Sequence, residues 1–250
     1  MKIYLLIIML VFSSLMLAQT LLFECDYWAP YNAEPNSDEP GFQVEIAQKI
    51  FEKAGFKFEY SLVPFTRALR NVQAGDAHGT FGLYESEANS NNLLLPKNHL
   101  GIGQTYFYVL TNNNWSYDGI SSLENQMLGV IQDYEYDDGE LDEFIEKNKN
   151  TMKVQVMTGD KALENNIQKL LNNRITVTLE DEAVMSWKLK KMGLEGKIKK
   201  AGIFDDSYKI FVAFTPTRPE LVDIFDKGVE ELRKSGELKK IFDKYGIEMK

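Results

Sequence analysis

The sequence is poor in residues that form covalent cross-links and positively charged surfaces. It has a single cysteine, Cys25, which cannot form an internal disulfide and which we interpret as a buried thiol in the first strand. Acidic residues outnumber basic ones by 37 to 28, so the net charge is −9. Because phosphate binding needs a basic surface, and no block of lysines and arginines is present, nucleic acid is excluded as a main partner.

The residue patterns of common catalytic and metal sites are also missing. Neither of the two histidines, His78 and His99, has a second ligand at metal spacing, so we expect no metal and no other cofactor. The chain shows no Ser-His-Asp order, no cysteine nucleophile with a partner and no phosphate-binding loop. These absences favour a binding protein over an enzyme.

Long apolar runs are absent except at the N-terminus, directly after Met1 and Lys2. A positive start, an apolar run and a small residue near Ala18 are typical of a secretory signal peptide, and we predict that residues 1–18 are removed. A retained membrane anchor is the alternative, which the shortness of the run disfavours. We therefore expect an exported protein that works in the periplasm, and we expect it to be a monomer.

Strand and helix patterns alternate in two series along the rest of the chain. In the first series, strands at 21–27, 57–63 and 77–83 alternate with helices at 41–56 and 65–75; in the second, strands at 127–131, 153–158 and 175–179 alternate with helices. Such alternation predicts parallel strands joined by right-handed crossovers. The expected fold class is therefore α/β.

Two longer strands, at 103–111 and 208–216, separate the two series and predict a molecule of two lobes. Lobe 1 is expected to comprise residues 19–108 and 213–250, and lobe 2 residues 109–212. The chain would then cross twice between the lobes, with a hinge in the long strands. A cleft between two lobes is a favoured place for a small ligand.

Four segments, taken in order, resemble those of a known family. They are "YWAPYN" after the first strand, "GFQVEIAQKIFEKAGF", "VPFTRALRNVQAGDAH" and the terminal "SGELKKIFDKYG". The chain resembles the extracellular solute-binding proteins of family 3, the amino-acid-type receptors of ABC transporters. This resemblance implies the type II periplasmic binding-protein fold, with two lobes and two hinge-crossing strands.

The sequence departs from the family pattern at the place where an amino acid's carboxylate is bound. The resemblance implies an arginine in the loop after the third strand, at or near Ala88, but neither arginine nor lysine occurs between Gly75 and Pro96. In lobe 2, the acids and tyrosines of "QDYEYDDG" stand where the family often has Gly-Thr or Gly-Ser. Asp181 is retained, at the position where the family often pairs an aspartate with the ligand's ammonium.

Several candidate side chains have a structural alternative. Trp28 and Tyr31 could stack on a ligand or pack over the following helix, and Phe81 fits a core position equally well. Arg67 could replace the missing clamp or lie on a solvated helix face. Asp181 could also cap the helix that follows it. The complete set of predicted ligand-binding residues is Trp28, Tyr31, Arg67, Thr80, Phe81, Tyr84, Glu85, Asp133, Tyr134 and Asp181.

The function that we predict is capture of a small polar solute, an amino acid or a related amine, for an ABC permease. The missing clamp and the acidic loop favour a cationic or weakly charged solute over an ordinary α-amino acid. One alternative is a ligand-sensing module that reports to a membrane signalling protein. Another is an enzyme similar to cyclohexadienyl dehydratase, in which Glu85 would be the general acid or base.

Overall fold

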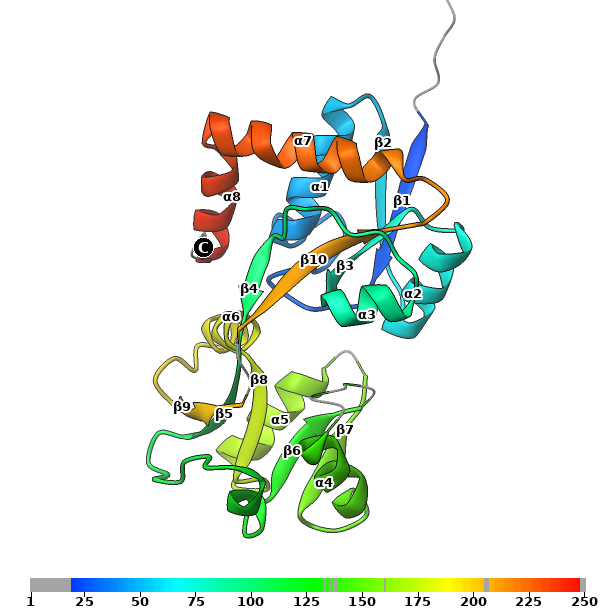
Figure 1. The fold of residues 1–250 in the computed structure, drawn as a ribbon. Coiled ribbons are helices and arrows are strands. Elements are labelled where there is room, and N and C mark those ends of the chain that lie inside the picture. Colours follow the sequence, from blue (N-terminus) through cyan, green and yellow to red (C-terminus); the bar gives the residue numbers. More distant parts are fainter. Residues whose placement is uncertain are drawn as a thin grey trace, which may run out of the picture.

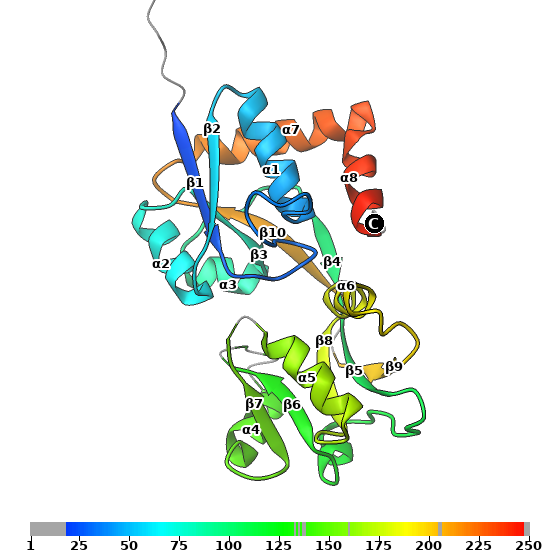
Figure 2. The ribbon, with the colours of Figure 1, turned by 180° about the vertical axis from the view of Figure 1, so that it is seen from behind.

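The computed structural model describes residues 19–132, 134, 136, 139–159, 161–204 and 207–247, so the predicted signal peptide lies outside the described residues. Two five-stranded sheets, each with its own helices, form two lobes (Figures 1 and 2). Their helices and strands lie in the α/β order predicted from the sequence. Within the part of the chain described here, no helix combines the length and the apolar character needed to span a membrane.

Lobe 1 is built on the sheet with the strand order β2-β1-β3-β10-β4. Strand β1 runs parallel to both β2 and β3, and β10 pairs antiparallel with β3 and β4. The strands are β1 (Thr20–Cys25), β2 (Lys57–Leu62), β3 (Gly79–Leu83), β4 (Gly101–Gly103) and β10 (Tyr208–Phe214). The helices are α1 (Phe42–Lys53), α2 (Phe65–Ala74), α3 (Glu85–Ser90), α7 (Glu220–Ser235) and α8 (Glu237–Tyr245).

Lobe 2 repeats this plan on the sheet with the order β7-β6-β8-β5-β9. Strand β6 runs parallel to β7 and β8, and β5 pairs antiparallel with β8 and β9. The strands are β5 (Thr105–Leu110), β6 (Leu128–Ile131), β7 (Val154–Met157), β8 (Val177–Asp181) and β9 (Ile198–Ile203). The helices are the 3-10 helix η1 (Ile120–Leu123), α4 (Glu140–Asn148), α5 (Ala162–Leu171) and α6 (Glu182–Met192).

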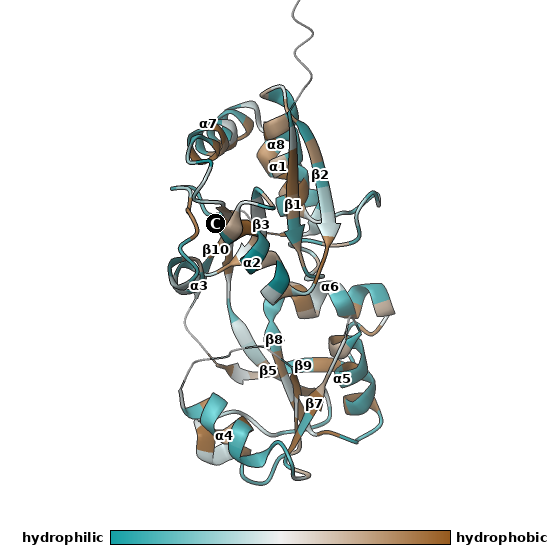
Figure 3. Ribbon diagram, turned by 90° about the vertical axis from the view of Figure 1, so that its right-hand side faces the viewer, coloured by the Kyte–Doolittle hydropathy of each residue, from teal (hydrophilic) through white to brown (hydrophobic). Residues whose placement is uncertain are grey.

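Aromatic rings fill the core of lobe 1. Residues of β1 alternate between buried and partly exposed, and Leu21, Phe23 and Cys25 are fully buried, so Cys25 is the buried thiol that the sequence predicts. The Phe23 ring contacts Phe51 and Phe81. In Figure 3 apolar residues lie in the strands of both lobes and hydrophilic residues mark α2 and α4, as expected for elements with one solvated face.

The chain changes lobe earlier in each long strand than the sequence predicts. It crosses at Gln104, between β4 and β5, and again between Ile203 and Tyr208. The predicted boundaries at 108/109 and 212/213 therefore fall inside β5 and β10, which each belong to one sheet. The reason is local: the Gln104 N–H donates to Asp181 and its carbonyl accepts from Glu182, so the turn binds the end of β8.

Candidate ligand site at the lobe junction

A stacked pair of aromatic rings from lobe 1 forms one side of the candidate site. The loop after β1 turns back on itself, because the Trp28 N–H donates to the Asn32 carbonyl and the Tyr31 N–H donates to the Trp28 carbonyl. This turn stacks the rings of Trp28 and Tyr31 with centroids 4.3 Å apart and planes 15° apart. Tyr31 is 2% exposed, whereas Trp28 is partly buried. The pair is a rigid aromatic surface at the edge of lobe 1.

Asp181 faces this pair from lobe 2, at the end of β8. It is the N-cap of α6, where its Oδ1 accepts from the N–H groups of Ala183 (2.9 Å) and Val184 (3.1 Å). Oδ1 also accepts from the Tyr31 hydroxyl, at 3.3 Å, across the two lobes. These contacts confirm the predicted capping role and join the lobes directly.

The second oxygen of Asp181 is also fully engaged. Its Oδ2 accepts from the Gln104 N–H at 3.3 Å and from the Tyr208 hydroxyl at 3.2 Å. Burial raises the pKa of Asp181 to about 6, although the donated hydrogen bonds act in the opposite direction. The carboxylate thus has five donors within the protein and is ionised at neutral pH.

Glu180, which the sequence analysis did not single out, lies beside Asp181 and is 5% exposed. Its Oε1 accepts from the Asp181 N–H at 2.9 Å, and the Trp28 side chain of lobe 1 faces its carboxyl closely enough to lower its pKa. Burial raises the pKa of Glu180 to about 8, and the negative charges of Asp181 and Asp26 raise it further. A carboxyl with this pKa is mostly protonated at pH 7.

Asp26 adds a third carboxyl to the junction, from the residue directly after β1. Burial raises its pKa to about 6. Its charge helps to raise the pKa of Glu180 and of Tyr134, both in lobe 2. The sequence carried a signal for it, because side chains at the carboxyl end of a parallel strand line the ligand-binding edge of such sheets.

Tyrosines supply most of the remaining surface of the junction. The Tyr84 ring lies 4.6 Å from that of Tyr208, and burial raises the pKa of Tyr84 above its usual range. Tyr134 is 36% exposed, and the charges of Glu180 and Asp26 help to raise its pKa. We call the following residues the junction cluster: Asp26, Trp28, Tyr31, Tyr84, Tyr108, Tyr134, Glu180, Asp181 and Tyr208.

Comparison with known proteins places this architecture in a family. The family model of bacterial extracellular solute-binding proteins, family 3, matches residues 24–248. The chain belongs to this family. It is 20% identical over 219 residues to the probable amino-acid-binding protein YxeM of Bacillus subtilis, a match that covers 86% of this chain and 79% of YxeM.

Solved structures share the fold of this family 3 protein. An ancestral arginine-binding protein bound to arginine superposes with a TM-score of 0.69 at 20% identity, covering 90% of this chain and 97% of that one. The arginine-bound substrate-binding protein AbpA of Streptococcus pneumoniae gives 0.68 at 20% identity, covering 92% and 97%. A histidine kinase sensor domain gives 0.72 at 16% identity, covering 91% and 96%. The fold of this solute-binding protein is therefore the two-lobed type II fold.

The structure brings five of the predicted site residues of this family member together at the junction: Trp28, Tyr31, Tyr84, Tyr134 and Asp181. For Phe81 the structure shows the core alternative: its ring is 1% exposed and stacks on Phe23. Thr80 is fully buried in β3, and within the described part of the chain its hydroxyl has no hydrogen-bond partner. Asp133 lies outside the described residues.

The remaining two candidates lie on exposed helix positions of lobe 1. Arg67 is exposed in the first turn of α2, and Glu85 is the exposed first residue of α3. Helix α3 stands where the sequence predicts a loop. Ala88, the position expected for the clamp, is fully buried on this helix against Leu83 and Leu93. An arginine side chain at this buried position would overpack the cluster.

Proposed function

We propose that this chain is a periplasmic receptor that closes its two lobes on a small amine-bearing solute and delivers that solute to an ABC importer. The observation that carries the proposal is the junction cluster, in which three carboxyls and several aromatic rings come from both lobes. Carboxylates and aromatic faces are the groups that bind ammonium and guanidinium ions in proteins. The predicted signal peptide supports export of the receptor.

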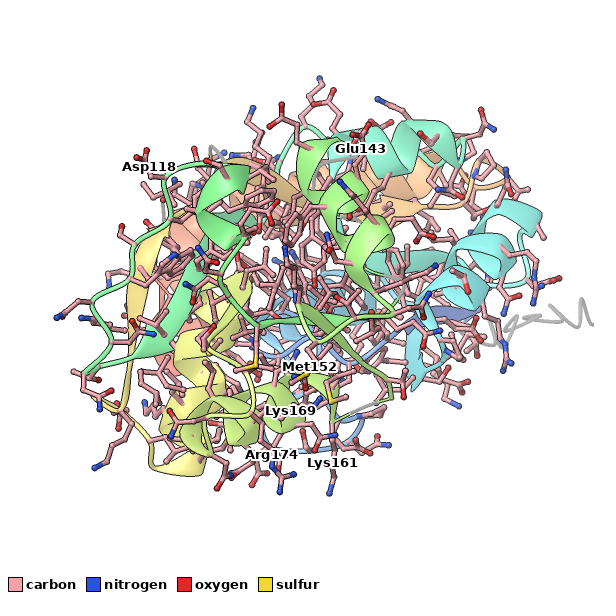
Figure 4. All side chains as sticks on the ribbon, turned by 90° about the horizontal axis from the view of Figure 1, so that it is seen from below. Asp118, Glu143, Met152, Lys161, Lys169 and Arg174 are labelled. Atoms are coloured by element: carbon pink, nitrogen blue, oxygen red, sulfur yellow. The ribbon has the colours of Figure 1, made fainter. Side chains whose placement is uncertain are left out.

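The charges of the junction favour a cationic solute. Among the described residues, no ion pair involves Asp26, Glu180 or Asp181. Three basic side chains of lobe 2, Lys161, Lys169 and Arg174, lie around α5 (Figure 4), and Lys191 and Lys200 are paired with Glu39 and Glu182. A cation entering the junction would therefore meet carboxyls that have no cationic partner of their own.

The relatives are consistent with this class of solute. Two solved proteins of the same fold are bound to arginine, whose side chain is a guanidinium. For a solute that also carries a carboxylate, Arg67 is the proposed partner, since the N-terminus of α2 follows the carboxyl end of β2. Simple amines without a carboxylate would not need this contact.

A thermal-shift screen of the chain from Gln19 onward tests the receptor function. The panel comprises L-arginine, agmatine, L-lysine, putrescine, L-citrulline, L-glutamate and a neutral sugar. A solute that binds only the folded protein raises the midpoint temperature of unfolding by mass action. At a solute concentration of a hundred times Kd, the free energy of unfolding increases by roughly 2.7 kcal/mol. We expect the cationic members to raise the midpoint, and a panel in which none does so would contradict the proposal.

The membrane partner of the solute-bound receptor is either an ABC permease or a signalling protein, and a separate experiment distinguishes the two. The structure of a histidine kinase sensor domain has the same fold, which keeps the sensing alternative open. Uptake of a radiolabelled cationic solute that depends on both this chain and a membrane permease would support transport. Binding without any effect on uptake, together with a change in a kinase or cyclase output, would support sensing instead.

A further inference from the structure

Two consecutive carboxyls of lobe 2, Glu180 and Asp181, lie against the stacked rings of Trp28 and Tyr31 in lobe 1. The two carboxyls differ in the number of hydrogen bonds that they accept. Asp181 accepts from the Tyr31 hydroxyl, and the Glu180 carboxyl faces the Trp28 side chain. Asp181 has five donors, whereas among the described residues the hydrogen bond that Glu180 accepts comes from the Asp181 N–H. A carboxylate offers about four lone-pair sites, so Asp181 is saturated while Glu180 can accept more hydrogen bonds.

We propose that Glu180, and not Asp181, receives the cationic group of the solute, and that Glu180 releases its proton to solvent as the cation enters. This inference rests on the proposed function and assigns its specificity to one residue. In the step, the O–H bond of the Glu180 carboxyl breaks and its proton passes to buffer. The carboxylate oxygen then accepts an N–H of the ammonium or guanidinium group at the side-chain end of the solute.

A buried hydroxyl without a partner supports a ligand at this place. The Tyr108 side chain is 4% exposed, and among the described residues its hydroxyl makes no hydrogen bond. Tyr106 pairs with Glu180 and Tyr108 with Thr178 in neighbouring strands, so Tyr108 and Glu180 lie on the same face of the sheet, and the charges of Asp181, Glu182 and Glu180 act on the Tyr108 hydroxyl. A buried polar group left without a partner costs free energy. A polar ligand bound at the junction would satisfy it.

The surroundings of Glu180 favour the neutral form until a cation arrives. The charge of Glu180 acts on tyrosines of several elements, and Asp26 and Asp181 act on Glu180 itself. The titratable groups that face it are Asp26, Asp181, Tyr31, Tyr84, Tyr108, Tyr134 and Tyr136. None of these is a lysine, an arginine or a histidine. Lys200, on the strand next to β5, is paired with Glu182 and lies over the Tyr106 ring.

The exchange of a proton for a cation has a defined pH dependence. Burial raises the pKa of Glu180 to about 8, so below pH 8 the free protein holds the proton that the cation must displace. The affinity for a cationic solute should therefore rise with pH up to about pH 8, by at most about tenfold per pH unit, and level off above it. Asp26 and Asp181, with pKa values of about 6, are already ionised over the upper part of this range.

Calorimetric titration at pH 7 in phosphate and in Tris measures the protons released on binding, because the two buffers differ in ionisation enthalpy. The probes are L-arginine, agmatine and L-citrulline, which keeps the α-ammonium of arginine but has a neutral side chain. We expect release of between half a proton and one proton with arginine or agmatine, and none with citrulline. Glu180→Gln should abolish the release and weaken cation binding about tenfold to hundredfold.

Matched variants separate this role from a structural one. Glu182→Gln changes an exposed neighbour and should leave affinity and proton release unchanged, whereas Glu180→Asp should keep the release. Unchanged arginine affinity and proton release in Glu180→Gln would overturn the assignment. Citrulline bound as tightly as arginine would overturn it while leaving the receptor function intact. A wild-type protein that binds no solute of the thermal-shift panel would instead contradict the proposed function itself.

Discussion

At the scale of single residues, the junction is organised by the unequal hydrogen bonding of two neighbouring carboxyls. Asp181 is the cap of α6 and the acceptor for Tyr31, Gln104 and Tyr208. Glu180, one residue earlier, is buried with fewer donors. Two carboxyls in different surroundings can take different roles. Here Asp181 has the structural role and Glu180 the proposed role in ligand binding.

Replacing Asp181 with Asn should destabilise the protein without ligand. In this variant an amide NH₂ group replaces the Oδ2 atom of Asp181. The Gln104 N–H, which now donates to Oδ2, would lose its acceptor. A buried donor left unpaired costs about 1–3 kcal/mol, so we expect a loss of this size in urea unfolding at pH 7. Glu182→Gln is the matched control, since Glu182 is exposed and pairs with Lys200. Equal stability of Asp181→Asn and wild type would contradict the structural role.

Replacing Glu180 with Gln should stabilise the ligand-free protein at high pH. Burial raises the folded-state pKa of Glu180 from 4.5 to about 8, so folding disfavours the ionised form. The unfolded chain loses this proton near pH 4.5, and wild-type stability therefore falls as pH rises from about 5 to 8. Glutamine has no such dependence. We expect the variant's advantage in urea unfolding to grow to about 2–4 kcal/mol by pH 8; a gap independent of pH would refute this.

The sequence predicts Trp28 and Asp181 at the junction but not the neighbouring acid Glu180. Trp28 follows β1 and Asp181 ends β8, at the ligand-binding edge of the sheets, and this position is visible in the strand pattern. Glu180 has the same position, but its importance comes from burial and from contact with Trp28, 152 positions earlier in the chain. Phe81 was misassigned because a strand residue near the edge can face either the ligand or the core.

At the scale of elements, the lobes are joined through the turn between β4 and β5. Gly103 precedes the crossing residue Gln104, and there is no room for a side chain there. A Cβ at Gly103 would lie 2.3 Å from Tyr208 Cε2 and 2.7 Å from Asp181 Oδ2. The absence of a side chain thus lets the start of β10 and the end of β8 meet at one point. The sequence predicts one continuous strand at 103–111, because the residue pattern of a strand does not indicate where the chain passes from one sheet to the other.

Gly103→Ala should weaken both folding and solute binding. The added methyl group would push the Tyr208 ring and the Asp181 carboxylate apart, and overpacking of this kind costs about 1–3 kcal/mol. Thermal unfolding and arginine calorimetry measure the two effects. Ile102→Ala, at an exposed neighbouring position, should change either quantity little. Normal binding in Gly103→Ala would show that this close packing is dispensable.

At the scale of the whole molecule, contacts from separate elements tie the lobes together. Besides the contacts of Trp28 and Tyr31 with Glu180 and Asp181, helix α6 of lobe 2 also contacts lobe 1. The Trp187 ring lies 5.6 Å from that of Tyr245 on α8, and Lys191 pairs with Glu39. Figure 1 shows α6 between the lobes, below α8. The two-lobed plan and the repeated α/β order were predictable from the sequence, whereas these contacts arise only in the folded chain.

Removing the polar groups of the stacked rings should loosen the lobes while keeping the rings in place. The double variant Trp28→Phe, Tyr31→Phe keeps the aromatic surface but removes the Tyr31 hydroxyl that donates to Asp181 and the Trp28 indole that faces Glu180. We expect a larger radius of gyration for the ligand-free variant in small-angle X-ray scattering, as hinge motion becomes easier. Trp115→Phe, within lobe 2, should leave the radius unchanged. A double variant as compact as wild type would show that the remaining contacts, the Tyr208–Asp181 bond and those of α6, hold the lobes without the rings.

The central claim is that the junction selects a cation, and the affinity of wild type for L-arginine relative to L-citrulline at pH 8 tests it most directly. The two solutes have nearly the same shape and differ in the charge of the side chain, so their ratio isolates the contribution of the carboxyls. We predict that arginine binds at least about tenfold more tightly, the effect of one charge-assisted hydrogen bond. Equal affinities, or tighter binding of citrulline, would contradict the account.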